Sequence, residues 1–164
     1  MRIGRIVFVA ALLLCIVEMI RLWGISPDQM AAHFNAQGVP DRFVFKAEFF
    51  LFQVQTLFIV VLVSLPIQVL FLLLPPSLIN MPNRDYWLAP ERKDETIGRL
   101  SDFGSMMFGI ILLTILAAFE ISTYANLQTP IHFNAGLMGV VMAASMGVIV
   151  LMLIQLILSF RMPK

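Results

Sequence analysis

Four long apolar runs, separated by shorter polar segments, dominate this sequence of 164 residues. They cover approximately residues 4–23, 49–74, 103–124 and 137–160. A helix needs about 20 mainly apolar residues to cross about 30 Å of hydrocarbon, and each run reaches that length. Because backbone groups in lipid must be hydrogen-bonded within the protein, each run is predicted to be a transmembrane helix.

The composition favours a bilayer over water as the surrounding solvent. Apolar residues make up 60% of the chain and charged residues 13%, whereas soluble domains have roughly a quarter charged residues. The net charge of +1 gives no basic surface for nucleic acid. Cys15 is the single cysteine, which excludes an intrachain disulfide. We expect an all-α polytopic membrane protein that forms one four-helix domain over residues 1–164.

The positive charges predict an orientation, because cytoplasmic loops of membrane proteins are enriched in lysine and arginine. Most cations fall on one side of the predicted spans, namely Arg2, Arg5, Arg84, Arg92, Lys93, Arg99, Arg161 and Lys164. Both termini and an inner elbow over residues 75–102 are therefore expected in the cytoplasm. The loops over residues 24–48 and 125–136 are expected on the outer face of a bacterial cytoplasmic (inner) membrane.

The tripeptide His-Phe-Asn occurs twice, once in each outer loop. The two copies begin at His33 and His132, which are the two histidines of the chain. Two spans separate the copies, so both should lie on the same side of the membrane. The sequence leaves open whether the repeat reflects duplication or coincidence.

The first outer loop has the residues of a structural turn. Pro27 and Asp28 suit the start of a short helix, and Gly38 fits a left-handed stop after it. Pro40-Asp41 fits a following turn, and Lys46 is expected at the headgroup level. The predicted turn motif comprises His33, Asn35, Gly38, Pro40, Asp41 and Lys46.

Two carboxylates lie in the outer halves of predicted spans. Placing a charge at a helix centre costs about 2.5–3.5 kcal/mol on insertion scales, and less near the edge. Glu18 has Arg21 one helical turn away as a partner. Glu120 has no cation in its own span, so we expect it either to bond a cation of another helix, such as Arg21, or to hold a proton.

The same side of the membrane also offers a possible metal site. His33, His132, Glu18 and Glu120 together could bind a divalent metal through nitrogen and oxygen, and the two histidines could bind haem. In the alternative reading, each histidine bonds local backbone and the carboxylates pair with Arg21. No His-x-x-x-His or Glu-x-x-His spacing is present. We therefore expect no cofactor.

Small residues recur at four-residue intervals in the last apolar run, at Gly139, Ala143 and Gly147. Such a stripe forms a groove that allows another helix backbone to approach closely. The groove could serve packing within the bundle or contact with another subunit, and the sequence does not separate the two.

Two separated motifs resemble a known bacterial family. The first loop contains Ser26-Pro27-Asp28, His33-Phe34-Asn35, Gly38, Pro40-Asp41 and Lys46, and the elbow contains Asn80-Met81-Pro82-Asn83 followed by Tyr86-Trp87-Leu88. Together they resemble the domain of unknown function 1648, over roughly residues 25–95. That family is related to the Sdp toxin immunity protein family, so the resemblance implies a membrane protein and, as one candidate, a role in immunity or signalling.

Motifs of the common enzyme classes are absent, including a nucleophile elbow, a glycine-rich phosphate loop and a metalloprotease helix. We expect a non-enzymatic accessory or interaction protein, either a small subunit of a larger membrane complex or an immunity- or signalling-type protein. Its expected partners are the lipid bilayer and another membrane protein or a second copy. The alternative is an outward-facing metal or proton site in a small transporter or redox component.

Overall fold

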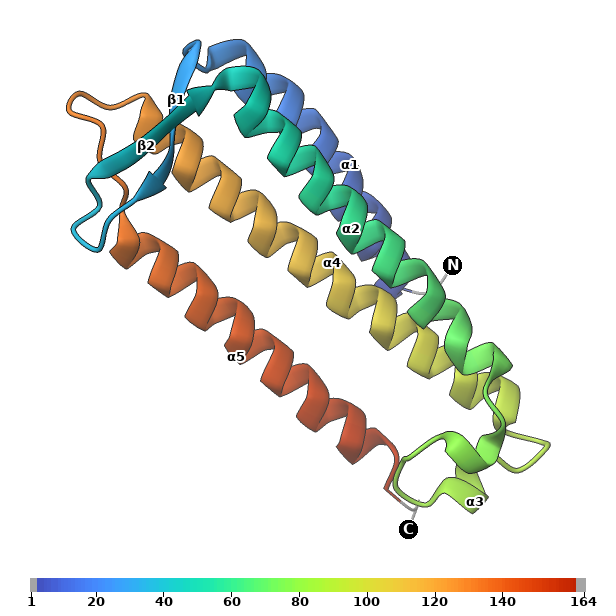
Figure 1. Cartoon of the computed structure of the whole chain (residues 1–164). Helices are drawn as coiled ribbons and strands as arrows, with labels where there is room; N and C mark the ends of the chain where they lie inside the picture. The colour runs from blue at the N-terminus through green and yellow to red at the C-terminus, as the bar shows by residue number, and fades with distance from the viewer. Residues whose placement is uncertain (1–2, 162–164) are drawn as a thin grey trace.

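Four long helices and a two-stranded sheet make up the computed structural model, which describes residues 3–161 (Figure 1). The helices are α1 (Ile3–Ile25), α2 (Lys46–Leu73), α4 (Lys93–Asn126) and α5 (Ala135–Ser159). All four are long and apolar enough to cross a membrane. The predicted class, an all-α polytopic membrane protein with four transmembrane helices, is confirmed.

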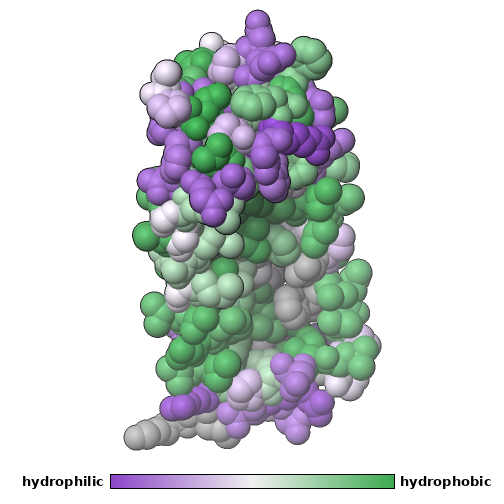
Figure 2. Space-filling model, turned by 60° about the vertical axis from the view of Figure 1, so that its left-hand side comes forward, coloured by the Kyte–Doolittle hydropathy of each residue, from purple (hydrophilic) through white to green (hydrophobic). Residues whose placement is uncertain are grey.

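The sheet lies at one end of the bundle, called here the hairpin end, together with the loop that joins α4 to α5. The opposite end, the elbow end, holds the end of α5 and the segment between α2 and α4, whereas α1 begins short of this end, beside Asp102 of α4. That segment contains a 3-10 turn, η1 (Pro76–Leu78), and a short helix, α3 (Arg84–Trp87). Figure 2 shows hydrophilic residues gathered at both ends and a hydrophobic band between them.

The third long helix begins earlier than its apolar run. α4 starts at Lys93, so residues 93–102 of the predicted elbow form the first turns of this helix. Asp94 and Glu95 lie in the first turn, where negative charge is favourable near the positive end of the helix dipole. Arg99 donates to Glu95 at 2.5 Å, one turn further on. These charged residues extend the helix beyond the apolar run.

The first outer loop is a β-hairpin, so the short helix predicted to start at Pro27 and Asp28 is wrong. Strands β1 (Gln29–Phe34) and β2 (Pro40–Phe45) pair antiparallel, with Gln29 opposite Phe45. Phe43-Val44-Phe45 consists of residue types that favour strands. Gly38 is left-handed as predicted, with φ +76°, but it turns a hairpin and does not end a helix. Pro40 opens β2, a position in a strand that tolerates proline, and does not lie in a separate turn.

The bundle is organised around α4, which runs between α1 and α2 on one side and α5 on the other (Figure 1). A buried apolar cluster joins α1, α2 and α4 through Phe8, Ala11, Cys15, Leu57, Leu112, Leu116 and Phe119. Glycines set the close approach of α1 and α4. A Cβ at Gly109 would lie 2.9 Å from Val7 Cγ1, and one at Gly4 would lie 1.9 Å from the Asp102 carbonyl oxygen. Neither position has room for a side chain.

Helix α5 is packed far less tightly than the others. None of its residues is buried. In its middle, Thr114 Oγ1 of α4 bonds Ser145 Oγ at 2.8 Å. At the elbow end, Asn83 Nδ2 and Trp87 Nε1 donate to the Phe160 carbonyl oxygen at 2.9 and 2.8 Å. These bonds satisfy a carbonyl that the end of a helix leaves without an intrahelical donor.

Candidate functional site at the hairpin end

The two His-Phe-Asn segments contact each other, although about a hundred residues of chain separate them. The rings of Phe34 and Phe133 stack with centroids 5.1 Å apart. The Phe133 N–H donates to the Gly38 carbonyl at 2.9 Å, and His132 Nε2 lies 3.0 Å from the Gln37 carbonyl oxygen. The loop between α4 and α5 is therefore docked on the turn of the hairpin.

The asparagine of each copy organises the backbone that follows it. Asn35 Oδ1 accepts from the N–H groups of Gln37 and Val39, both at 3.0 Å, and so shapes the hairpin turn. Asn134 Oδ1 accepts from the Leu137 N–H at 2.8 Å and caps the first turn of α5. Asparagine is well suited to both tasks because its side-chain oxygen replaces a backbone acceptor. The same residue type thus begins a turn in one copy and a helix in the other.

The histidines have different partners. His132 bonds the backbone of the other loop, at Gln37. His33 Nδ1 lies 2.6 Å from Asp41 Oδ1 across the hairpin, and both side chains are exposed, at 68% and 45%. Two residues of the predicted turn motif, His33 and Asp41, thus bond each other across the hairpin. The expectation of a local backbone partner is wrong for both histidines, because His33 bonds a side chain and His132 bonds the backbone of a loop about 95 residues away.

Lys46 connects the first two spans at the hairpin end. Its Nζ donates to the carbonyl oxygens of Trp23 and Ser26, both at 3.2 Å, and lies 4.8 Å from the centre of the Trp23 ring. A cation at this point satisfies free carbonyls at the C-terminal end of α1 and the negative end of its dipole. Lys46 thus fixes the corner between α1 and α2, in addition to its predicted place before the second span.

Asn126, which the sequence did not single out, joins α4 to the hairpin. Its Oδ1 accepts from the Ala31 N–H at 2.6 Å, and its Nδ2 donates to the Ala31 carbonyl at 3.1 Å and to the Ser122 carbonyl at 2.9 Å. The side chain is 5% exposed. It therefore pairs with β1 in the way that a neighbouring strand would. The feature of the sequence that could have drawn attention to Asn126 is its position, as a polar residue at the end of the third apolar run.

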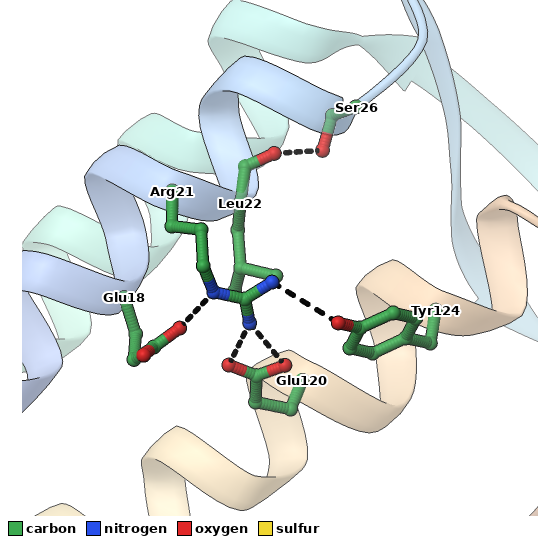
Figure 3. A network of polar contacts seen from close by, with 6 residues as sticks. All are labelled: Glu18, Arg21, Leu22, Ser26, Glu120 and Tyr124. Carbon is green, nitrogen blue, oxygen red and sulfur yellow. Dashed lines mark hydrogen bonds and ion pairs between the residues drawn. The ribbon is translucent and has the colours of Figure 1, made fainter.

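Arg21 gathers the two carboxylates of the outer halves, as expected in the structural reading (Figure 3). It bonds Glu18 on its own helix through Nε, and its Nη2 donates to both Glu120 oxygens at 2.7 and 2.9 Å. Its Nη1 donates to Tyr124 Oη at 3.0 Å, a partner that the sequence did not suggest. One guanidinium between two carboxylates leaves this cluster, Glu18–Arg21–Glu120, with an excess of one negative charge when both are ionised.

The four residues considered as metal ligands do not lie together. Glu18 and Glu120 bond Arg21, His33 bonds Asp41, and His132 bonds Gln37. Among residues 3–161 there is no group of three or more His, Cys, Asp and Glu side chains placed to hold a metal ion. The geometry instead uses these side chains to connect α1 to α4 and one loop to the other.

The small-residue stripe of α5 is open. Gly139, Ala143 and Gly147 are all exposed, and a Cβ added at either glycine would meet nothing within 4 Å. Ser145, which bonds Thr114 of α4, lies on the opposite side of the helix at 100° per residue. Among the residues that the structure describes, no helix packs on the stripe. Of the two uses left open, packing within the bundle and contact with another subunit, the stripe is available for the second.

Comparison with known proteins identifies a family for the first part of the chain. Residues 9–59 match the family model described as "Domain of unknown function (DUF1648)". This segment, from α1 through the hairpin into α2, belongs to that family, in agreement with the motifs around His33. No curated protein matches the chain significantly, and no solved structure does.

Proposed function

We propose that this protein is a non-enzymatic accessory protein that binds another membrane protein along the open face of α5. The observation that carries the proposal is the exposed stripe of Gly139, Ala143 and Gly147 on a helix with no buried residue. Small residues at this spacing allow a second helix to approach closely, and in lipid such packing drives helix association. The expected occupant is a transmembrane helix of a larger complex.

The remaining charges support an orientation for this complex. Arg84, Arg92, Lys93 and Arg99 lie at or beside the elbow end, and the hairpin end carries fewer cations. The positive-inside rule then assigns the elbow end to the cytoplasm and the hairpin end to the outer face of a bacterial cytoplasmic membrane. The motif resemblance favours an immunity- or signalling-type role for the complex over a catalytic one.

Cysteine cross-linking in native membranes tests the proposal. Ala143→Cys is made in a Cys15→Ala background, because Cys15 is the single native cysteine. Ser145→Cys on the face toward α4 is the matched control. We expect a short reagent with a maleimide at one end and a photoactivated diazirine, which inserts into C–H bonds, at the other to join Ala143→Cys, and not Ser145→Cys, to a second protein. We expect Gly139→Leu to suppress that adduct.

Two outcomes would overturn it. If Ala143→Cys forms no adduct in membranes where the protein is expressed at its normal level, the open face of α5 is a lipid-facing surface. If the adduct has twice the mass of the chain and contains no other protein, α5 joins two copies and the accessory role is wrong.

A second candidate function, a proton site in a small transporter, is favoured by one observation. Glu18 and Glu120 share one guanidinium, and their side chains are 23% and 24% exposed. Two carboxylates face one guanidinium, so one negative charge is not neutralised. Such a carboxylate within a membrane span can serve as a step in a proton pathway. Proton uptake by vesicles that contain the protein, compared with vesicles that contain Glu120→Gln, tests this reading. Equal uptake by both would remove it.

A further inference from the structure

A cavity of about 280 Å³ lies beneath the hairpin, between α2 and α4. Its lining comes from β1, β2, α2 and α4 and consists of Ala32, Arg42, Val44, Glu48, Phe49, Phe52, Gln53, Phe119 and Ser122. In Figure 2 the hydrophobic surface is hollowed directly below the hydrophilic cap of the hairpin end. The volume is near the lower limit of about 300 Å³ for small-molecule sites in proteins.

Gln53 is the unusual residue of this lining. Its side chain is 1% exposed, and within the part of the chain that the structure describes neither Nε2 nor Oε1 has a hydrogen-bond partner. Buried polar side chains are bonded in the large majority of cases, so an amide without partners needs an explanation. A glutamine amide has two N–H donors and one acceptor oxygen. A ligand that satisfies Gln53 must therefore supply an acceptor for Nε2 and a donor for Oε1.

The rest of the cavity defines the other part of a ligand. Phe49, Phe52 and Phe119 supply aromatic surface on which an apolar or aromatic group can pack. The lining has two charged residues of opposite sign, and Arg42 Nη2 lies 3.6 Å from Glu48 Oε1, so the two charges neutralise each other. The cavity therefore offers no uncompensated charge, and it favours a neutral molecule.

We propose that this cavity binds a neutral amphipathic molecule with a carboxamide group, whose amide pairs with Gln53 and whose apolar part packs among the three phenylalanines. A carboxamide carries both an acceptor and a donor, so it can satisfy Gln53 Nε2 and Oε1 at once. A ketone can accept from Nε2 but leaves Oε1 without a donor. The site thus selects the amide over a ketone of the same shape.

Equilibrium dialysis with two matched probes tests the inference. Phenylacetamide and phenylacetone differ in replacing the amide NH₂ by a methyl group, and each is dialysed against the full chain in nanodiscs with empty nanodiscs as blank. We expect saturable phenylacetamide binding that is at least tenfold tighter than that of phenylacetone. Gln53→Leu should remove this difference, whereas Gln55→Leu, the same change at an exposed site on α2, should preserve it.

The result that overturns the proposal is equal binding of both probes, or phenylacetamide binding that Gln53→Leu leaves unchanged. A lack of saturable phenylacetamide binding overturns it as well and indicates that water satisfies Gln53. Ser122→Leu, which fills the cavity from α4, provides a second variant if Gln53→Leu does not fold. It should abolish binding of the amide probe, and retained binding would locate the probe elsewhere.

Discussion

Replacing Gly38 should destabilise the protein more than removing either partner of the exposed His33–Asp41 pair. Gly38 has φ +76°, and a Cβ there would lie 2.4 Å from the Phe133 carbonyl oxygen and 3.0 Å from His132 Cε1. Gly38→Ala therefore meets two obstacles, one in its own backbone and one in the docked loop. Gly38→Val meets both more severely, because its side chain is larger and branched at Cβ.

The magnitude follows from these two obstacles. A left-handed conformation costs a residue with a side chain about 1–2 kcal/mol. Moving the loop to relieve the overlap breaks the bond from Phe133 N to the Gly38 oxygen, which contributes about 0.5–1.5 kcal/mol. We expect Gly38→Ala to cost about 2–3 kcal/mol in the free energy of unfolding. His33→Ala removes an exposed pair and should cost about 0–1 kcal/mol.

Thermal melting of the detergent-solubilised protein, followed by the monodisperse size-exclusion peak, measures the ranking. Gly24→Ala is the matched control, because Gly24 lies within α1 and a Cβ there meets nothing within 4 Å. It should be neutral or stabilise by up to about 1 kcal/mol. A larger loss for His33→Ala than for Gly38→Ala, or equal melting of the two alanine variants at Gly38 and Gly24, would refute the docking of the two loops.

Three further predictions use the same preparation. Asn126→Leu leaves the backbone N–H and carbonyl of Ala31 without partners, so it should cost about 2–3 kcal/mol, and an unchanged melting temperature would contradict the role of this amide. Arg21→Gln leaves Glu18 and Glu120 without their cation and should lower the folded yield. Adding Glu120→Gln removes one of the two unpaired carboxylates and should restore part of the yield. A double variant that folds no better than Arg21→Gln alone would argue against the pairing. Trp87→Phe removes one donor from the carbonyl of Phe160, the residue that caps α5, and should speed hydrogen exchange in the final turn of that helix. Unchanged exchange would show that the elbow does not stabilise this end of α5.

Sequence reasoning reached the features that depend on local composition. The four spans follow from apolar length, and the cost of an unpaired charge in lipid gave the bond from Glu120 to Arg21 as one of two alternatives. Gly38 was identified as left-handed from its turn context. Each of these inferences needs only the residue, its neighbours and the solvent.

The remainder depends on contacts between distant parts of the chain. The hairpin was missed because Pro27 and Asp28 favour a helix start locally, whereas strand pairing with Phe43-Val44-Phe45 determines the structure. The sequence shows that Asn126 is a polar residue at the end of an apolar run, but not that its amide pairs with Ala31, about 95 residues away. The unpartnered state of Gln53 is likewise a property of the packing, since a glutamine in an apolar run is ordinarily expected to find a partner on another helix.

The corner made by Lys46 has a consequence for the order in which the chain can assemble. α1 and α2 both pack mainly on α4, whereas the bonds from Lys46 join the C-terminal end of α1 to the start of α2 without any residue of α4. We therefore expect the first two spans to form a pair joined at the hairpin end, called here the fork, on which α4 packs afterwards. Co-expression of residues 1–82 with residues 83–164 examines this order, because a self-contained fork should accept the second fragment and yield the same monodisperse complex. Failure of the fragments to associate, while each is present in the membrane, would show that the fork needs α4 in the same chain to form.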